Sequence, residues 1–268
     1  MTALRDRPLR ILGGRPVGFI ARNAVQPRNY AALANMVRRY PRPVDAARRY
    51  FLARGSYPVR FPVRTPAGTM RPTLWSYHDM ITLQEMFCRE DYGVRGGAPR
   101  TVVDIGSNIG LSALYFLTRG PQVRCHLYEP VPRNVERLHE NLAAFEDRFE
   151  IEQVAVADFD GEATFGVEDT GRYGGLGVVL PDTERVRCRN INTVLEDVLA
   201  TADRIDVLKI DVEGHEATLV EAIRPDLLAR IELIYAETVD VEIRTPDGFE
   251  ATAACDTVRL RNVALTRP

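Results

Sequence analysis

Lysine is nearly absent from this chain. Lys209 is the single lysine among 35 basic residues, and arginine carries the rest of the positive charge. Such a bias is typical of GC-rich coding and indicates an actinobacterial source. It also marks Lys209 as a residue whose surroundings need an explanation.

Paired cysteines are lacking as well. Cys88, Cys125, Cys188 and Cys255 are widely spaced, and neither a Cys-x-x-Cys pair nor a Cys/His cluster with zinc-site spacing occurs. This pattern excludes a disulfide-stapled scaffold. It predicts free thiols in a reducing cytoplasm.

Long hydrophobic runs do not occur either. No segment approaches the ~20 apolar residues of a transmembrane helix, and the first residues are positively charged without the apolar stretch of a signal peptide. With 45% hydrophobic and 27% charged residues over 268 positions, the composition is that of one globular α/β domain with an extension. We expect a cytoplasmic protein without a transmembrane segment.

Negative charge is scarce at the beginning of the chain. Residues 1–55 contain twelve arginines and only two acids, Asp6 and Asp45, a formal charge of +10, whereas the whole chain carries -2. We interpret this segment as a basic extension that packs on the acidic remainder of the chain. An anionic substrate, an anionic partner, a membrane surface or a homo-oligomer contact are the alternatives.

The residue pattern divides the chain into two predicted domains, 1–95 and 96–268. The first is expected to contain short helices, a β-hairpin at 59–75 and a further helix for which Asp79 is the N-cap. The first of these helices, at 29–40, has apolar residues at helical spacing. They are Tyr30, Leu33, Met36 and Val37.

From residue 100 onward, segments typical of strands and helices alternate, which predicts a doubly wound, mostly parallel sheet with helices on both faces. In such sheets the ligand binds beyond the carboxyl ends of the strands. The expected strands are 101–105, 125–128, 150–156, 163–167, 207–210 and 233–237, and the expected helices are 110–118, 132–144, 191–200 and 216–228.

A glycine-containing turn follows the first of these strands. It has the spacing D-x-G-x-x-x-G and comprises Asp104, Gly106, Ser107, Asn108 and Gly110. This is not the G-x-G-x-x-G pattern of dinucleotide binding, in which a helix N-terminus receives a pyrophosphate. S-adenosylmethionine (SAM) has no phosphate and carries a sulfonium cation, which suits an acidic residue. The turn therefore predicts a SAM site, with a purely structural turn as the alternative.

Acidic residues also follow the next two strands. Glu129, followed by Pro130, lies about twenty residues after the glycine turn, where a carboxylate accepts hydrogen bonds from both ribose hydroxyls in nucleotide-binding folds. Ala157 and Asp158 end the third strand, and we expect them to contact the adenine amino group.

Several charged residues cluster at the end of the strand at 207–210. Asp211 is the predicted general base, Lys209 is expected to orient it or to stabilise an oxyanion, and Glu213, His215 and Glu237 are further candidates. A salt-bridged, helix-capping loop is the structural alternative. Carboxylates of this kind also bind magnesium, but we predict no metal site.

The ordered segments DIGSNIG, YEPVPRNVERLHEN, VAVAD and IDVLKIDVEGHE resemble those of the FkbM-type methyltransferases, over about residues 60–240. A similar leading segment contains Asp79, Glu85 and Tyr92. The resemblance implies a class I SAM-methyltransferase (Rossmann-like) fold with a seven-stranded sheet. It also implies that Glu85 and Tyr92 help to bind the cofactor. It finally implies O-methylation of a hydroxyl on a small molecule, a natural product or a sugar-containing intermediate. Residues 238–268 differ from the family, since they are short and mostly β-like.

Three other functions compete with O-methylation. An N-methyltransferase would use a carboxylate such as Asp211 or Glu213 to bind an amine or guanidine. A nicotinamide oxidoreductase is disfavoured by the glycine spacing, and a catalytically silent SAM-binding subunit by the acids at 104, 129 and 211. No nucleic-acid substrate is expected, because both the Asn/Asp-Pro-Pro-Tyr/Phe tetrapeptide and the Pro-Cys nucleophile of DNA methyltransferases are lacking.

Overall fold

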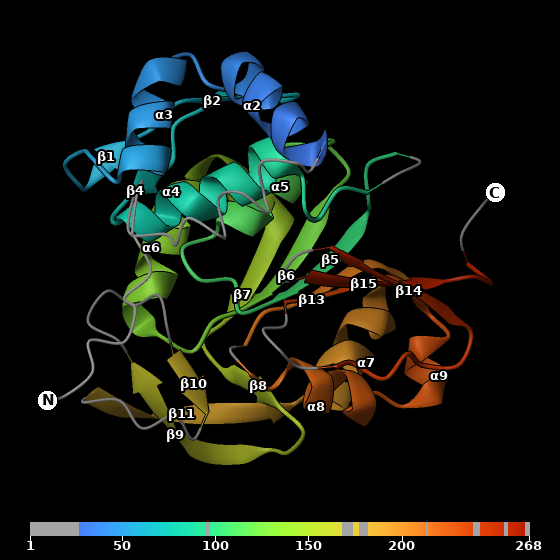
Figure 1. Ribbon diagram of the computed structural model, residues 1–268. Helices are drawn as coiled ribbons and strands as arrows, with labels where there is room; N and C mark the ends of the chain where they lie inside the picture. The colour runs from blue at the N-terminus through green and yellow to red at the C-terminus, as the bar shows by residue number, and fades with distance from the viewer. Residues whose placement is uncertain are drawn as a thin grey trace, which may run out of the picture. The chain divides into compact units, whose positions relative to one another are not determined.

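The computed structural model describes residues 27–94, 97–167, 174–176, 182–212, 214–237, 242–254 and 257–265 (Figure 1). The chain forms two compact units, 1–90 and 91–268. The predicted division into functional domains at residue 95 stays a prediction.

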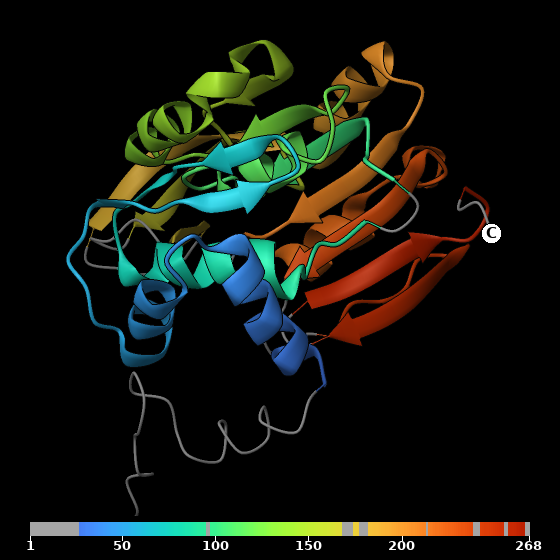
Figure 2. The same cartoon turned by 90° about the horizontal axis from the view of Figure 1, so that it is seen from above.

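The first unit contains short helices and small antiparallel strand pairs. Strands β2 and β3 form the hairpin that the sequence predicts, visible in cyan in Figure 2, and β1 pairs with β4 beyond it. The elements are α2 (Pro27–Arg39), α3 (Pro43–Leu52), β1 (Val59–Arg60), β2 (Val63–Thr65), β3 (Gly68–Met70), β4 (Thr73–Leu74), α4 (Tyr77–Gln84) and η1 (Glu85–Arg89).

Helix α2 is rotated relative to the sequence prediction. Met36 is buried, but Leu33 and Val37, which helical spacing would place on a shared apolar face, are 43% and 63% exposed. Polar contacts to η1 accompany this rotation: Asn35 donates a hydrogen bond to the carbonyl of Cys88, and Arg39 forms a 2.8 Å ion pair with Glu90. The helix itself is present as predicted, but apolar spacing alone does not indicate these polar contacts or which side of the helix they bury.

The start of α4 also differs from the prediction. Ser76, not Asp79, is the N-cap: its hydroxyl accepts the N–H of Asp79, and the Asp79 carboxylate accepts the N–H of Ser76 in return. This reciprocal arrangement is a capping box, which satisfies two otherwise unpaired N–H groups. The helix therefore begins three residues earlier than expected.

The second unit is built on a seven-stranded sheet with the order β14-β15-β13-β12-β5-β6-β7. Only β15 among these strands runs antiparallel to its neighbours. This is the doubly wound class I methyltransferase fold, as predicted. The strands are β5 (Thr101–Ile105), β6 (Arg124–Tyr128), β7 (Phe149–Glu152), β12 (Ile205–Ile210), β13 (Ile231–Glu237), β14 (Phe249–Ala254) and β15 (Thr257–Asn262).

Helices cover both faces of this sheet (Figure 1). One face is covered by α5 (Leu111–Leu117), α6 (Pro132–Leu142) and the short η2 (Ala143–Arg148). The other is covered by α7 (Ile191–Thr201), α8 (Glu216–Ala222) and α9 (Pro225–Leu228), which pack with β5, β12 and β13 in one apolar core. The single helix predicted at 216–228 is broken at Arg224, because a residue that precedes proline is disfavoured in the helical conformation. None of the described helices has the length and apolar character needed to cross a membrane.

A second sheet of four strands lies between β7 and α7 in the sequence, in the order β10-β9-β11-β8. Its strands are β8 (Ala155–Ala157), β9 (Gly161–Val167), β10 (Gly174–Leu176) and β11 (Asp182–Asn190). The single strand predicted at 150–156 is therefore divided between two sheets. Strand β11 was not predicted, because its charged residues alternate with the Val186 and Cys188 side chains that it buries.

Candidate functional site

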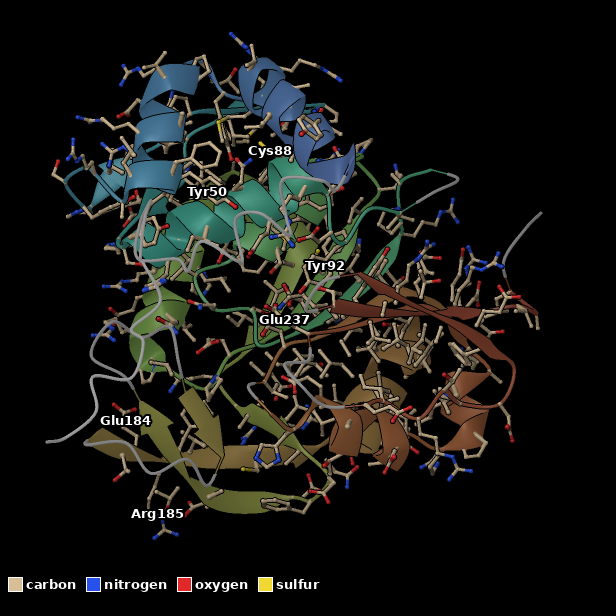
Figure 3. All side chains as sticks on the ribbon, in the orientation of Figure 1. Tyr50, Cys88, Tyr92, Glu184, Arg185 and Glu237 are labelled. Carbon is tan, nitrogen blue, oxygen red and sulfur yellow. The ribbon has the colours of Figure 1, made fainter. Side chains whose placement is uncertain are left out.

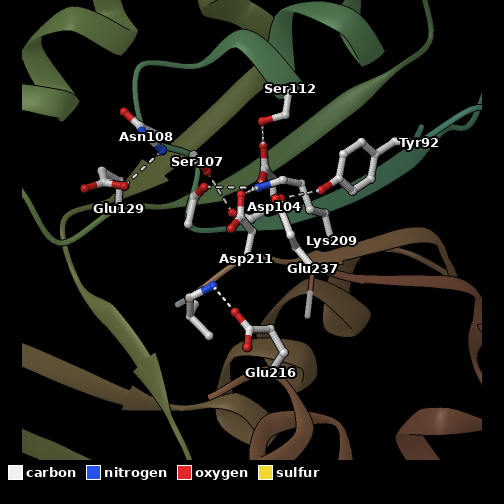
Figure 4. Close-up of polar contacts among 12 residues, drawn as sticks. Tyr92, Asp104, Ser107, Asn108, Ser112, Glu129, Lys209, Asp211, Glu216 and Glu237 are labelled. Carbon is white, nitrogen blue, oxygen red and sulfur yellow. Dashed lines mark hydrogen bonds and ion pairs between the residues drawn. The ribbon is translucent and has the colours of Figure 1, made fainter. Parts of the chain in front are cut away.

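The site lies where the order of the central sheet reverses. Strand β5 pairs with β12 on one side and with β6 on the other, and the carboxyl ends of all three strands lie at one edge. In open α/β sheets this crevice is the usual ligand site. Figure 4 shows the polar side chains that gather there.

The glycine turn after β5 has a structural requirement that the sequence did not reveal. Gly106 has φ +79°, and a Cβ added there would lie 1.9 Å from the carbonyl oxygen of Asp211. Gly110 has φ +82°, and its added Cβ would meet Leu138 at 3.0 Å. The absence of a side chain at Gly106 thus allows the loop after β12 to lie against the glycine turn. The glycine is therefore required by the protein's own packing and not only by contact with a ligand.

Glu129 at the end of β6 ties two loops together. Its Oε2 accepts the backbone N–H of Asn108 at 2.9 Å, and its Oε1 accepts the N–H of Val131 at 3.0 Å and the amide of Asn134 at 3.2 Å. Burial raises the pKa of Glu129 to about 7, against the opposing effect of these hydrogen bonds. A carboxylate has roughly four acceptor positions, so Glu129 retains capacity for a further donor. The assignment of Glu129 to a ribose stays a prediction.

Asp104 and Ser107 are enclosed within the turn. The Asp104 side chain is fully buried and accepts hydrogen bonds from the Ser112 hydroxyl and from Lys209. The Ser107 hydroxyl donates to the Asp104 carbonyl at 2.7 Å and accepts the N–H of Tyr128 at 3.2 Å. Both side chains hold the turn in shape, so any influence of Asp104 on a ligand passes through its neighbours.

Lys209 joins the glycine turn to the loop after β12. It is 2% exposed, and its Nζ lies 2.9 Å from Asp104 Oδ1, 3.1 Å from the Gly106 carbonyl oxygen and 3.2 Å from Asp211 Oδ2. Burial alone would lower the pKa of Lys209, but the carboxylates of Asp104 and Asp211 outweigh it and hold that pKa above its usual value. The buried lysine therefore remains a cation.

Asp211 is the most accessible of these charged groups. Its side chain is 31% exposed, and its N–H donates to the Ile105 carbonyl at 3.1 Å. The following loop is closed by Glu216, which is 3% exposed and accepts the N–H groups of Val212 and Gly214 at 3.0 and 2.9 Å. Sequence reasoning did not include Glu216 in the site, although a glutamate that begins a helix after a glycine is a recognisable capping signal.

The other candidates in this loop are less well defined. His215 is half-buried at the N-terminal end of α8 and makes no side-chain cap there. Glu213 lies outside the described residues. Among the residues that are described, no group of three potential metal ligands occurs.

Tyr92 and Glu237 form a pair at the carboxyl end of β13, pointing toward one another (Figures 3 and 4). The Tyr92 hydroxyl donates to Glu237 Oε2 at 3.2 Å. The Tyr92 ring packs edge-on against Tyr235, with ring centres 5.2 Å apart, and the Tyr235 hydroxyl donates to the Gly93 carbonyl. The structure therefore brings Tyr92 to the same sheet edge as Asp211.

The remaining predicted residues lie on two other elements and in two loops. Pro130 is buried between β6 and α6, Ala157 is buried at the end of β8, and Asp158 is exposed, with its carbonyl accepting the Asn190 amide at 2.7 Å. Glu85 begins η1 in the first unit and forms a 3.3 Å ion pair with Arg89. The assignment of these residues to cofactor binding stays a prediction.

The sequence is similar to those of known proteins over half or more of its length. It is 27% identical over 199 residues to the AMB antimetabolite synthetase AmbE of Pseudomonas aeruginosa (59% of this chain, 9% of the relative). It is 28% identical over 158 residues to the 2-O-methyltransferase NoeI of Sinorhizobium fredii (53% of this chain, 64% of the relative). It is also 28% identical over 215 residues to the 31-O-demethyl-FK506 methyltransferase FkbM of Streptomyces tacrolimicus (67% of this chain, 82% of the relative). The matches thus span a small part of AmbE and under two thirds of NoeI.

The crystal structure of methyltransferase FkbM from Methylobacillus flagellatus KT aligns with a TM-score of 0.41 and 15% identity, over 79% of this chain and 48% of that one. The family described as the methyltransferase FkbM domain matches residues 104–260, more than half of the chain. The region matched begins at Asp104 and includes the turn, Glu129, Lys209 and Asp211. The chain belongs to the FkbM family of methyltransferases, which implies SAM as the methyl donor.

Proposed function

We propose that this protein transfers a methyl group from SAM to a hydroxyl of a small molecule, a natural product or a sugar-containing intermediate, with Asp211 as the base. The observation that carries the proposal is the position of Asp211. Its carboxylate is partly exposed at the carboxyl end of β12, beside the glycine turn, and is held there by a buried cation. The names of the 2-O-methyltransferase NoeI and of the Streptomyces 31-O-demethyl-FK506 methyltransferase describe O-methylation, which supports the same reaction class.

The residues proposed to hold SAM surround the same edge of the sheet. The turn from Gly106 to Gly110 would cradle its amino-acid end, Glu129 would accept a hydrogen bond from a ribose hydroxyl, and Asp158 would contact the adenine. SAM supplies a methyl group that is already activated by its positive sulfur. The protein must then orient the acceptor hydroxyl and remove its proton, and orientation in line with the methyl group can contribute several kcal/mol.

Asp211 is suited to take that proton. Lys209 contacts one carboxylate oxygen, Oδ2, at 3.2 Å, which fixes the direction of the side chain. The other oxygen would then face the acceptor and take its hydroxyl proton, while the methyl–oxygen bond forms, the methyl–sulfur bond of SAM breaks and S-adenosylhomocysteine is the leaving group. General-base assistance of this kind contributes about 10²–10⁴-fold. Lys209 remains protonated throughout and acts as a positioning residue.

Substitution of Asp211 by asparagine tests the proposal, because it keeps the size and removes the charge. We expect Asp211→Asn to bind SAM with unchanged affinity by calorimetry and to lose at least about tenfold in turnover. Turnover is followed as release of S-adenosylhomocysteine with a panel of glycosides and polyols. Asp203→Asn, at an exposed position before β12, is the matched control. Full turnover in Asp211→Asn would exclude Asp211 as the base.

A second candidate is N-methylation of an amine or guanidine. The observation that favours it is that Glu237 and Asp211 end neighbouring strands, so that two carboxylates lie at one edge where a cation would bind. In that case Asp211 binds the acceptor rather than taking its proton. Asp211→Asn would then raise the KM of an amine acceptor more than it lowers kcat.

A further inference from the structure

One side of α2 and the start of α3, both in the first unit, carry exposed apolar side chains. Tyr30, Leu33 and Val37 lie at positions i, i+3 and i+7 of one helix face. They are 63%, 43% and 63% exposed, and Val44 at the beginning of α3 is 82% exposed. Large aliphatic side chains gathered on one face in this way mark an interaction surface.

Exposed arginines lie on the same two helices and directly after them. Arg38, Arg42 and Arg54 are exposed, as is Arg48, and nitrogen-tipped side chains fringe both helices in Figure 3. Asp45 is the only acid in α2 and α3, and it is already paired with Arg48 at 3.0 Å and with Arg49 at 3.1 Å. The surface is therefore both apolar and positively charged.

The two properties meet in a hollow at the N-terminal end of α3. It has a volume of about 440 Å³ and is lined by Arg42, Pro43, Val44, Asp45 and Arg48. The negative charge of Asp45 offsets the charge of one of the arginines with which it forms an ion pair. Arg42 and a second arginine then remain to attract an anion. An anionic head group would therefore sit beside the aliphatic side chain of Val44.

We propose that this surface of α2 and α3 binds an anionic phospholipid bilayer. Helices with exposed aliphatic side chains and arginines can insert into the head-group region of a bilayer, which needs no matching groove. A folded protein partner would have to supply a groove that fits these helices. A second copy of the chain would bring its own arginines against these arginines. A nucleic acid would leave Leu33, Val37 and Val44 without apolar contacts. The inference concerns peripheral binding by the first unit and is independent of the proposed methyl acceptor.

The test is flotation of the full-length chain with vesicles of phosphatidylcholine, with and without phosphatidylglycerol. We expect binding only to the vesicles that contain phosphatidylglycerol, weakened by salt because surface charges are screened. Removing one basic residue near a lipid surface weakens binding about fivefold, so Arg42→Ala should show a loss of that size. The double substitution Val37→Asp with Val44→Asp should abolish binding.

Two controls keep the test decisive. Val263→Asp introduces the same charge at another exposed valine, which is 48% exposed in the second unit, and should leave vesicle binding unchanged. All variants should unfold at the wild-type temperature, because each site is on the surface. If wild-type protein does not float with phosphatidylglycerol vesicles, or if the double valine variant floats equally well, the inference is wrong. Equal binding to soluble polyglutamate, insensitive to the valine substitutions, would indicate an acidic protein partner instead.

Discussion

Replacement of Lys209 by methionine removes a buried positive charge while keeping most of the side-chain volume. The ammonium lies 2.9 Å from Asp104 and 3.2 Å from Asp211, and Asp104 is fully buried. In Lys209→Met the Asp104 carboxylate would keep a hydrogen bond from Ser112, but its charge would have no counter-ion within reach among the described residues. Asp211 can turn toward solvent, so most of the cost arises at Asp104.

The expected loss follows from that uncompensated charge. Removal of one partner of a buried ion pair destabilises proteins by about 3–5 kcal/mol. At roughly 2–4 °C per kcal/mol for a domain of about 150–250 residues, the melting temperature should fall by roughly 6–20 °C. Differential scanning calorimetry measures this directly, and urea unfolding gives the free energy.

A double-mutant cycle separates the ion pair from general packing. The double variant Lys209→Met with Asp104→Asn should lose less unfolding free energy than the two single variants lose together. The reason is that Asp104→Asn removes the buried charge that Lys209→Met leaves without a counter-ion. Lys209→Arg is the matched control for charge. It should not restore stability, since a planar guanidinium cannot replace the compact ammonium between three oxygens. Additive losses in the cycle, or wild-type stability of Lys209→Met, would refute this account.

Three further predictions follow from the site. Gly106→Ala should lower the free energy of unfolding in urea by about 2 kcal/mol or more, because its Cβ would lie 1.9 Å from the Asp211 carbonyl oxygen. Gly248→Ala is the control and should lose less, since Gly248 has a similar φ of +82° but no atom within 4 Å of an added Cβ. Equal losses in the two variants would contradict the close approach at Gly106. Glu216→Gln should lower kcat while leaving the KM for SAM unchanged, since Glu216 holds the loop after Asp211; a change in KM alone would argue against this role. Glu129 has a pKa of about 7, above the ~4.3 of an unfolded glutamate, so the folded state binds its proton more tightly. The contribution of Glu129 to the free energy of unfolding therefore becomes less favourable as pH rises from about 4 to about 7. In urea titrations, Glu129→Gln should make the free energy of unfolding depend less on pH over this range. An unchanged pH dependence would show that Glu129 does not cause it.

The sequence predicts the central sheet well because its signals are local. Buried parallel strands have nearly continuous apolar residues, and Gly106 and Gly110 mark the turn between β5 and α5. Once the strands alternate with helices, topology places the carboxyl ends of β5, β6 and β12 together. Asp104, Glu129 and Asp211 could therefore be assigned to one edge before the structure was known.

Other features depend on contacts between distant residues. The rotation of α2 accompanies the hydrogen bond from Asn35 to Cys88 and the ion pair from Arg39 to Glu90, neither of which has a periodic signature. The division of segment 150–156 between two sheets depends on pairing of β8 with β11, a strand that the charged sequence conceals. Such pairings become visible only when the chain is folded.

The single lysine shows why residue identity can be informative where spacing is not. Lys209 and Asp104 are direct partners across β12 and β5, so their side chains lie on the same face of the sheet. The Nζ atom has three hydrogens, and three oxygens lie within 3.2 Å of it, from Asp104, Gly106 and Asp211. Arginine, which this chain uses nearly everywhere else, presents five N–H groups in a rigid plane and cannot direct three of them to such a compact set of oxygens. The Lys209 ammonium therefore contacts both the turn proposed to bind SAM and the carboxylate proposed as the base. One side chain thus fixes the position of the proposed methyl-donor site relative to the proposed base.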